Sequence, residues 1–387
     1  MITYSFLQQY WWLLVSLLGG LLVFLMFVQG ANTLIFRLGT DEAERTLIVN
    51  STGRKWEFTF TTLVTFGGAF FASFPLFYST SFGGAYWVWM LILVSFVLQA
   101  VAYEYQSKEG NVLGRTMYRR FLVFNGFVGP FVLGAAVATF FTGSAFVVER
   151  GAMGVSDTLA LSPVISRWAN AWHGLDALAN PWNWVLGLAV FFLARVLGAL
   201  YLLNNIEDEA MRPRLRRQVG IDAVPFLLLF LAFLGYVLTA TGLAYDPVTQ
   251  RFVPEAYKYL HNLIAMPLVA GVLLFGVVLV LFGMGKTCFC ASFRRGIWTA
   301  GIGTVLTVLA LLLVAGWNNT AYYPSSVDIQ SSLCLQNSCS SEFTLTTMAW
   351  VSLLIPFVLV YIAYAWYKID LGGISRKEMQ GDKDHQY

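Results

Sequence analysis

A single carboxylate, Glu57, stands directly before a long apolar run. Arg54, Lys55 and Trp56 precede it, and residues 58–78 carry no charge. A carboxylate at the edge of the hydrocarbon is costly, so its side chain is expected to face protein or water, which makes Glu57 a candidate functional residue. The alternative is an ion pair with Arg54 or Lys55 at the head-group level, and the spacing alone leaves both interpretations open.

Few other polar residues interrupt the apolar runs. Gln29 and Asn32 lie three residues apart, on one face of a helix. Glu104 and Asp222 stand at the ends of apolar runs, whereas Arg195 lies inside one and is long enough to reach the interface. For these three charged residues, anchoring at the interface or an ion pair within one helix is the simpler interpretation.

The histidines do not form a recognisable metal or heme site. His173, His261 and His385 all lie outside or at the mouth of apolar runs, and no cluster of potential ligands has metal-binding spacing. The sequence therefore predicts a chain without heme or metal of its own, in which His261 is an interfacial hydrogen-bonding residue. No nucleotide-binding or nucleophile motif occurs in a usable context, and no nucleic acid is expected as a partner.

The composition identifies the setting of these residues. Of 387 residues, 58% are hydrophobic and 12% are charged, and the mean hydropathy is +0.66. Soluble proteins carry roughly 25% charged residues, so this is a polytopic membrane protein. Residues 1–10 contain no Lys or Arg, which favours a retained first helix over a signal peptide.

Nine apolar runs of about twenty residues predict nine transmembrane helices. Their approximate limits are 10–34, 58–79, 83–103, 121–142, 183–203, 223–244, 261–282, 297–316 and 344–366. The predicted fold is all-α, a single membrane domain in which two four-helix bundles are followed by one further helix. Its parts are a first bundle over 1–142, an outer loop over 143–182, a second bundle over 183–316, an outer loop over 317–343, and a ninth helix with a cytoplasmic tail over 344–387.

The cations predict the orientation of these helices. Nineteen of the 24 Lys and Arg residues fall in alternate connecting segments, namely 37–56, 104–120, 204–222, 283–296 and 367–387, and the other connecting segments hold four. Cation-rich segments remain in the cytoplasm, so the N-terminus is expected outside and the C-terminus inside. The segment 37–56 is expected to form a short interfacial helix on the inner face.

The four cysteines then fall on opposite sides of the membrane. Cys288 and Cys290 lie in a predicted inner loop, where thiols stay reduced. Cys334 and Cys339 lie in a predicted outer loop, where a disulfide closing a small ring is expected.

Two functional classes agree with these residues. The first is a subunit of a membrane electron-transfer or proton-moving complex that lacks its own cofactor, and the second is a secondary transporter. No span is clearly broken in mid-membrane by Gly or Pro next to polar residues, as transporter sites require. Bends are nevertheless expected at Pro75, Pro130, Pro267 and Pro356.

A set of short motifs is spread in order along the chain. The motifs are Trp11-Trp12-Leu13-Leu14-Val15, Trp56-Glu57, Gly67-Gly68-Ala69-Phe70-Phe71-Ala72-Ser73-Phe74-Pro75, Tyr103-Glu104-Tyr105-Gln106-Ser107-Lys108, Phe127-Val128-Gly129-Pro130-Phe131-Val132-Leu133-Gly134, Asn180-Pro181, Pro324-Ser325-Ser326 and Ile374-Ser375-Arg376-Lys377-Glu378. The ordered set resembles subunit II of the cytochrome bd quinol oxidases over nearly the whole chain.

The resemblance implies a complex of the bacterial cytoplasmic membrane that oxidises quinol and reduces oxygen to water. Hemes b and d and the quinol-oxidising site are implied to lie in subunit I. This chain would then support subunit I, while its first helices line a proton path from the cytoplasm. Further expected partners are membrane lipids, a structural quinone or lipid, and a small single-helix subunit.

The chain departs from the family where protons are implied to move. Gln29 and Asn32 stand where many members carry acids, Glu57 replaces an Asp, and Gln99-Ala100 replaces an Arg-Pro. Amides hold water but cannot take up a proton as acids do. The predicted proton path therefore comprises Glu57 and Trp56, Gln29 and Asn32, and water.

Overall fold

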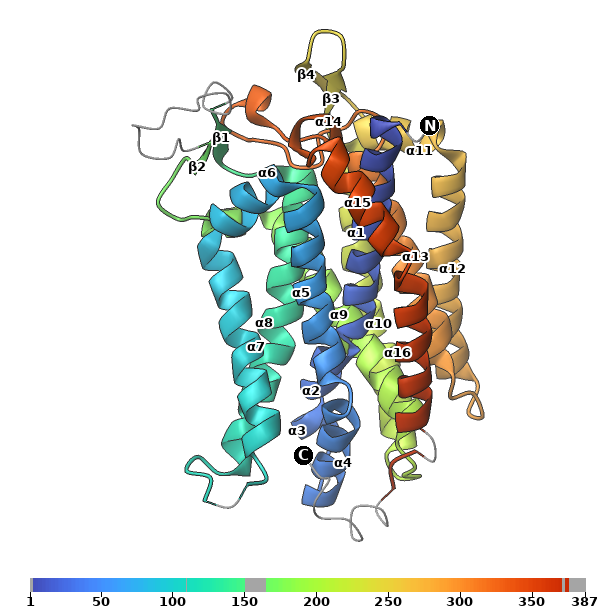
Figure 1. Cartoon of the computed structure of the whole chain (residues 1–387). Coiled ribbons are helices and arrows are strands. Elements are labelled where there is room, and N and C mark those ends of the chain that lie inside the picture. The colour runs from blue at the N-terminus through green and yellow to red at the C-terminus, as the bar shows by residue number, and fades with distance from the viewer. Residues whose placement is uncertain (1–2, 109, 150–164, 371–372, 376–387) are drawn as a thin grey trace.

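The computed structural model describes residues 3–108, 110–149, 165–370 and 373–375 (Figure 1). Eight segments within these residues are long and apolar enough to span a membrane, and a bent ninth passes the same test, in agreement with the predicted all-α fold. The eight are α1 (Tyr4–Leu25) with α2 (Phe27–Asn32), α7 (Tyr86–Tyr105), α8 (Arg115–Thr142), α9 (Pro181–Asn205), α10 (Arg212–Thr239), α12 (Pro267–Phe289), α13 (Gly296–Gly316), and α15 (Glu342–Ser352) with α16 (Ile355–Ile369).

The second predicted span, 58–79, does not run straight. Helix α5 (Trp56–Ser73) ends before Pro75, and the chain turns by 117° into α6 (Pro75–Phe77) and a π-helical segment, η1 (Tyr78–Gly83). The residue before a proline is disfavoured in the helical conformation, and Phe74 adopts φ −132° and ψ 64°. The crossing by α5 is therefore shorter than the apolar run that predicted it.

The predicted interfacial helix on the inner side is present as α4 (Glu42–Gly53), after the short α3 (Ile35–Leu38). The Asp41 carboxylate caps α4 by accepting a hydrogen bond from the Glu44 backbone N–H at 2.7 Å. Leu47, Ile48 and Val49 of α4 are buried. The helix is interrupted at residues 54 and 55, and α5 begins directly after this break. The position of α4 therefore determines where the second span begins.

Helices from both predicted bundles pack against each other. The most extensive contacts join α12 with α13, α10 with α9, α8 with α9, and α1 with α13. Helix α2 crosses α9 so closely that a Cβ on Gly30 would lie 1.8 Å from the carbonyl oxygen of Ala194. Small residues permit such approaches between membrane helices. The division into two bundles stays a prediction.

The connections gather at two ends of the molecule (Figure 1). Helix α4 and the links from α7 to α8, α9 to α10 and α12 to α13 lie at one end, below in Figure 1, and these links carry the predicted inner cations. At the other end lie α11 (Lys258–Ala265), α14 (Leu335–Ser338), and hairpins formed by β1 (Phe146–Val148) with β2 (Ser166–Trp168) and β3 (Gly242–Asp246) with β4 (Arg251–Glu255). We call these the inner and outer ends.

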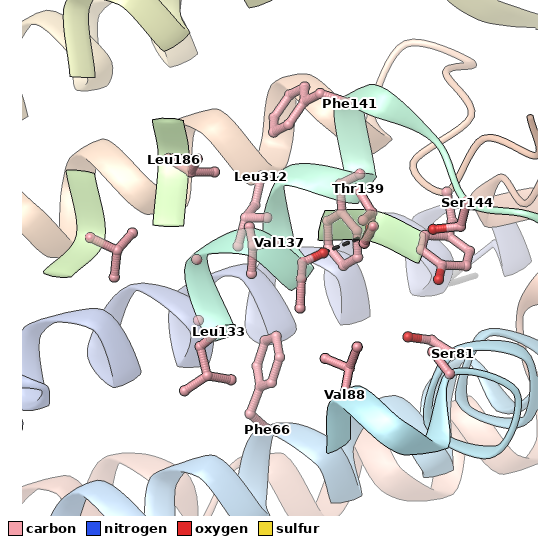
Figure 2. Close-up of a pocket in the computed structure, with 18 of the residues that line it drawn as sticks. Phe66, Ser81, Val88, Leu133, Val137, Thr139, Phe141, Ser144, Leu186 and Leu312 are labelled. Atoms are coloured by element: carbon pink, nitrogen blue, oxygen red, sulfur yellow. Dashed lines mark hydrogen bonds between the residues drawn. The ribbon is translucent and has the colours of Figure 1, made fainter. Parts of the chain in front are cut away.

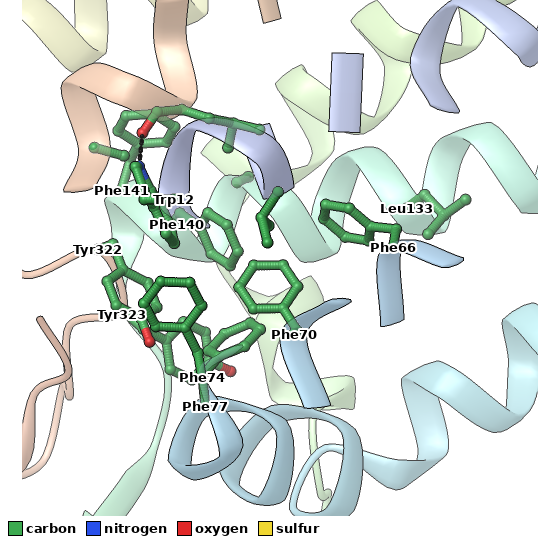
Figure 3. Close-up of a cluster of buried hydrophobic side chains, with 14 of the residues drawn as sticks. Trp12, Phe66, Phe70, Phe74, Phe77, Leu133, Phe140, Phe141, Tyr322 and Tyr323 are labelled. Atoms are coloured by element: carbon green, nitrogen blue, oxygen red, sulfur yellow. Dashed lines mark hydrogen bonds between the residues drawn. The ribbon is translucent and has the colours of Figure 1, made fainter. Parts of the chain in front are cut away.

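An aromatic cluster fills the outer half of the core (Figure 3). Phe70 is completely buried, and its ring packs against those of Trp12, Phe66 and Phe77 at centroid distances of 4.4–6.1 Å. The Trp12 indole N–H donates to the Leu312 carbonyl at 2.9 Å, so its polar atom is satisfied. The cluster joins α1, α5 and α13 near their outer ends.

Helix α16 differs from the other spans. Among its residues, all of them described, only Trp366 is buried. The Trp366 ring packs against Phe24, Phe58 and Trp298 at centroid distances of 5.6–6.2 Å. Helix α16 is thus held at its inner end, while most of its length is exposed in the isolated chain.

Candidate functional site

The inner ends of α5 and α7 are joined by a pair of stacked aromatic rings, each followed by a carboxylate in the sequence. The Trp56 and Tyr103 rings stack with centroids 5.9 Å apart and planes 16° from parallel. Glu57 follows Trp56, Glu104 follows Tyr103, and both carboxylates are exposed. Lys55 does not pair with Glu57 but is buried against Asp370, with Nζ 3.0 Å from Oδ1.

Behind this aromatic pair lies a buried polar cluster that includes predicted Asn32. The Tyr103 hydroxyl donates to Asn32 Oδ1 at 2.7 Å and also lies 2.8 Å from Thr52 Oγ1 on α4. Thr59 on α5 donates to the Leu25 carbonyl at 2.9 Å, which fixes α5 against α1. Tyr103 therefore connects the exposed inner edge with the end of α2.

One turn deeper, predicted Gln29 meets a residue of α7. Gln29 Nε2 donates to Gln99 Oε1 at 3.0 Å, and both amides are fully buried. Deeper still, Asn125 Nδ2 on α8 donates to Ser95 Oγ at 3.3 Å. A line of buried polar side chains thus runs from Tyr103, at the inner end, toward the middle of the membrane.

The regular spacing of the α7 residues in this line was not recognised as a functional pattern in the sequence. Ser95, Gln99 and Tyr103 recur every four residues, the spacing of one helix face, and all are buried. Polar residues repeated at this interval in an otherwise apolar span indicate a helix face turned toward protein or water rather than lipid. Asn125 gave no such signal, because its neighbours on α8 are apolar.

Arg195 and Asp222 form an ion pair, but between helices rather than within one. Arg195 Nε on α9 lies 3.1 Å from Asp222 Oδ1 on α10, and Arg195 Nη1 donates to Thr33 Oγ1 at 2.8 Å. Gln218 Nε2 donates to Asp222 Oδ2 at 2.7 Å, and Arg37 Nε donates to Gln218 Oε1 at 2.7 Å. The sequence suggested interfacial anchoring or an ion pair within one helix, and it did not predict this pairing because helix neighbours depend on tertiary packing.

The outer half of the same helices encloses an apolar cavity (Figure 2). It measures about 110 Å³ and is lined mainly by aliphatic and aromatic side chains, among them Phe66, Val88, Val137 and Leu312. A second apolar cavity of about 70 Å³ shares Val190 and Leu311 with the first. Apolar cavities of this kind stay dry and accept apolar groups.

The predicted Cys334–Cys339 disulfide is not formed in the structure, where Cys339 carries a free thiol. Cys334 precedes α14 and Cys339 follows it. An α-helix rises about 1.5 Å per residue, so the turn between the two cysteines holds their Cα atoms apart. A disulfide requires a short Cα distance of about 4.4–6.8 Å. Burial raises the pKa of the Cys339 thiol to about 12.

The described histidines lie at the outer end and are engaged there. His173 Nδ1 lies 3.0 Å from the Gly84 carbonyl oxygen, and the ring stacks on Tyr86. His261 Nδ1 lies 2.8 Å from Glu255 Oε1, in keeping with an interfacial hydrogen-bonding role. Among the described ranges, no group of three or more His, Cys, Asp or Glu is placed to hold a metal ion, and His385 lies outside them.

Known proteins resemble this chain along its whole length. It is 30% identical over 402 residues to cytochrome bd-I ubiquinol oxidase subunit 2 of Escherichia coli strain K12, covering all of both chains. It is 26% identical to cytochrome bd ubiquinol oxidase subunit 2 of Bacillus subtilis strain 168, covering 93% of this chain and 95% of the relative. The bd oxidase structure of Geobacillus thermodenitrificans shares the fold with a TM-score of 0.63 at 15% identity, covering 94% of this chain and 98% of that one.

The family model for cytochrome bd terminal oxidase subunit II matches residues 7–369. This match and the identity to the E. coli subunit confirm the resemblance drawn from the motifs. With its eight or more apolar helices, the protein is a multi-pass protein of the bacterial cytoplasmic membrane. The chain belongs to the cytochrome bd terminal oxidase subunit II family.

Proposed function

We propose that this chain is the heme-free second subunit of a quinol-oxidising, oxygen-reducing complex, and that it admits protons at Glu57. The family implies a first subunit as partner. The single observation that carries the proton role is that Glu57 follows Trp56, whose ring stacks on Tyr103 at the start of the buried polar line. Exposed Glu57 and Glu104 flank the stacked Trp56 and Tyr103, from which buried polar side chains lead inward.

The proposed route divides the work between carboxylates and neutral groups. Glu57 takes a proton from the cytoplasm, and water behind Trp56 carries it toward Tyr103 and Asn32. The Tyr103 hydroxyl can accept a proton from one neighbour and donate to another, whereas amides only hold water in place. Hemes b and d in subunit I would supply electron transfer and oxygen reduction, which consumes the protons.

The histidine positions support the absence of heme from this chain. A heme inside the bundle needs an axial ligand there, whereas His173 and His261 lie at the outer end against Gly84 and Glu255. Replacing both histidines with Gln is therefore expected to leave the heme content per complex unchanged. Loss of a heme from the double variant, measured as a pyridine hemochrome, would contradict this.

Helix α16 is the proposed support for subunit I. Phe357, Val360 and Tyr361 are 70–74% exposed, and exposed side chains surround the helix. Helix packing in membranes depends on close van der Waals contact, which α16 lacks over most of its length here. Apolar helices of subunit I would provide it. The outer cavities of 110 and 70 Å³ are the proposed place for the tail of a structural quinone or lipid.

Glu57→Gln tests the proton role in the assembled complex. Gln keeps the size and hydrogen bonding of Glu but cannot carry a proton, so quinol-driven oxygen consumption is expected to fall about tenfold or more. Glu57→Asp is expected to retain much of the activity. Heme content and assembly should stay near those of the parent enzyme in both variants.

Two further variants make this test specific. Glu104→Gln shows whether the neighbouring carboxylate shares the role, and Glu342→Gln, an exposed carboxylate at the start of α15, serves as the matched control. If Glu57→Gln respires like the parent, Glu57 is an interfacial anchor and protons enter elsewhere. The transporter alternative instead requires substrate flux in vesicles that contain this chain without subunit I.

A further inference from the structure

A pocket of about 380 Å³ lies at the inner end of the molecule, where α3 and α4 meet α8. It is lined by Phe36 of α3, Arg45 of α4, and Thr116, Arg120 and Val123 of α8. Two guanidinium groups and a hydroxyl thus stand beside an aromatic ring and an aliphatic side chain. The pocket shares no lining residue with the two apolar cavities of the outer half.

The carboxylates nearest to the pocket in the sequence are engaged elsewhere. Glu42 pairs with buried Arg119, whose Nη1 lies 2.8 Å from Glu42 Oε1. Glu44 pairs with Arg214 of α10. Arg120, which follows Arg119, is exposed and forms no ion pair with the residues that the structure describes. Its positive charge therefore remains available to a ligand.

Arg45 is held in position by contacts that leave its terminal nitrogens unused. Its Nε donates to the Gly39 carbonyl at 3.1 Å, and its guanidinium carbon lies 5.5 Å from the centroid of the Phe36 ring. A Cβ at Gly39 would lie 2.6 Å from Arg45 Cγ, so the glycine makes room for the arginine stem. Within the described ranges, neither Nη1 nor Nη2 has a hydrogen-bond acceptor or a carboxylate. Arg45 is thus a preorganised donor with a second unmatched charge.

The face of α8 that carries Arg120 continues into the membrane as an apolar surface. Thr116, Arg120, Val123 and Phe127 are spaced by four, three and four residues, which places them on one side of the helix. Phe127 is 42% exposed. From Arg120 to Phe127 the helix rises about 10 Å, a large part of the roughly 15 Å hydrocarbon depth of one leaflet. A hydroxyl and a cation are therefore followed by an apolar path of leaflet depth.

This order of groups matches an anionic phospholipid. The planar fork of an arginine binds phosphate oxygens with two parallel hydrogen bonds, and basic pockets between membrane helices bind lipid head groups. A free phosphate would use only the polar side of the pocket. A zwitterionic lipid would bring a cation of its own between two arginines, which like-charge repulsion disfavours.

We propose that Arg45, Arg120 and Thr116 bind the phosphate of one anionic phospholipid, whose acyl chain lies along Val123 and Phe127. The lipid bridges α4 and α8 beside the ion pair of Arg119 with Glu42 that already joins these helices. The site is independent of the proposed proton route, because none of its residues belongs to the buried polar line.

Photolabelling of the intact complex tests this site. The probe is phosphatidylglycerol with a diazirine in its acyl chain, used below saturation in phosphatidylcholine vesicles, and label on residues 121–127 is measured by mass spectrometry. Near a membrane surface one arginine contributes about fivefold to the affinity for an anionic lipid. Arg120→Gln should therefore reduce the label about fivefold, and the double variant with Arg45→Gln about thirtyfold.

Two further variants separate the site from general surface charge and from damage to the fold. Arg217→Gln removes an exposed cation of α10 at the same inner end, outside the pocket, and should label like the parent. Arg120→Lys keeps the charge without the fork and should label between the parent and Arg120→Gln. Because Arg120 is exposed and forms no ion pair in the described ranges, its variants should keep the parental heme content and thermal stability. Equal labelling of Arg120→Gln and the parent would overturn the inference.

Competition identifies the occupant. Unlabelled phosphatidylglycerol should remove the label, whereas the same concentration of additional phosphatidylcholine or of inorganic phosphate should not. Equal competition by phosphatidylcholine would show that the charge of the head group is not recognised, and equal competition by phosphate would show an anion site without a lipid. Label that is absent from residues 121–127 but present elsewhere would show that another segment, such as an acidic one of subunit I, covers the pocket. Each of these three results overturns the phospholipid site.

Discussion

The inner halves of the first helices bury polar side chains, whereas their outer halves bury apolar ones. Helix α7 presents Tyr103, Gln99 and Ser95 in its inner half, and Ile92 and Val88 in its outer half, toward the same side of the helix. The inner half holds amides with unpaired atoms, whereas the outer half holds an aromatic cluster and a dry cavity. One helix face thus changes from a polar surface to an apolar one.

This difference separates two tasks within one bundle. Unpaired polar atoms also occur in the outer half, at the Tyr259 hydroxyl and the Trp317 indole, but they belong to separate elements. In the inner half they face one another across three helices. Native proteins rarely bury such groups without a reason, which agrees with the proposal that protons enter through the inner half, while the aromatic cluster stabilises the outer half.

The largest effect is expected from damage to the outer half. Phe70→Ala removes a fully buried ring from the aromatic cluster and should lower the free energy of unfolding by about 3–5 kcal/mol. Thermal unfolding of the complex measures this loss. Phe275→Ala, on the exposed face of α12, is the control and should change stability little. Equal effects at the two sites would show that the cluster does not stabilise the fold.

A substitution in the inner half should lower oxygen consumption strongly and change stability little. Gln99→Leu keeps the side-chain volume but removes the hydrogen-bond acceptor of Gln29 Nε2. Water can take the place of this acceptor, so the free energy of unfolding should change by no more than about 1–2 kcal/mol. Oxygen consumption should nevertheless fall about tenfold. Thr239→Val, at the exposed outer end of α10, removes a hydroxyl bonded to the Gly235 carbonyl and should alter neither quantity. A Gln99→Leu enzyme that unfolds at a lower temperature than the parent but consumes oxygen at the parental rate would contradict this difference between the two halves.

The sequence predicted the elements that depend on local pattern. Apolar run length located the spans, and the buried residues Leu47, Ile48 and Val49 follow from the amphipathic segment at 37–56. The bend before Pro75 was anticipated only as a kink. Its angle of 117° depends on how α6 and η1 pack above α5, which no local pattern specifies.

The sequence could not predict the partners of buried polar groups. Lys55 pairs with Asp370, more than three hundred residues away, and Arg195 pairs with Asp222 on the next helix. The disulfide was expected because both cysteines lie in a predicted outer loop, whereas α14 places them at opposite ends of a turn. Glu57 was found because a carboxylate before an apolar run is visible locally, whereas Asn125 acquires meaning only through its neighbours in space.

Filling the outer cavity should have a small stabilising effect. Val137→Leu adds one methylene group to a cavity of about 110 Å³, and burying it is worth about 0.8 kcal/mol if no strain results. Thermal unfolding with co-purified quinone and lipid quantified by mass spectrometry measures both outcomes. Higher stability without loss of ligand indicates an empty cavity. Lower stability with loss of quinone indicates that a tail occupies it.

Thiol labelling gives the smallest effect and tests which end is the inner one. Hydrogen bonding by Ser292 lowers the pKa of the Cys290 thiol below its usual value, while burial raises the pKa of Cys339 to about 12. The thiolate is the reactive form, so at pH 7–8 Cys290 should react quickly with a membrane-impermeant maleimide and Cys339 very slowly. Inside-out vesicles should therefore label Cys290, whereas right-side-out vesicles should label neither residue appreciably.

The pH dependence of labelling distinguishes slow thiols from a disulfide. The rate at Cys339 should rise steeply between pH 8 and 10, because the thiolate fraction increases about tenfold per pH unit below the pKa. A Cys334–Cys339 disulfide would instead block labelling at every pH until a reductant is added. Rapid labelling of Cys290 in right-side-out vesicles would reverse the orientation, and the polar line ending at Glu57 would then open to the outside rather than to the cytoplasm.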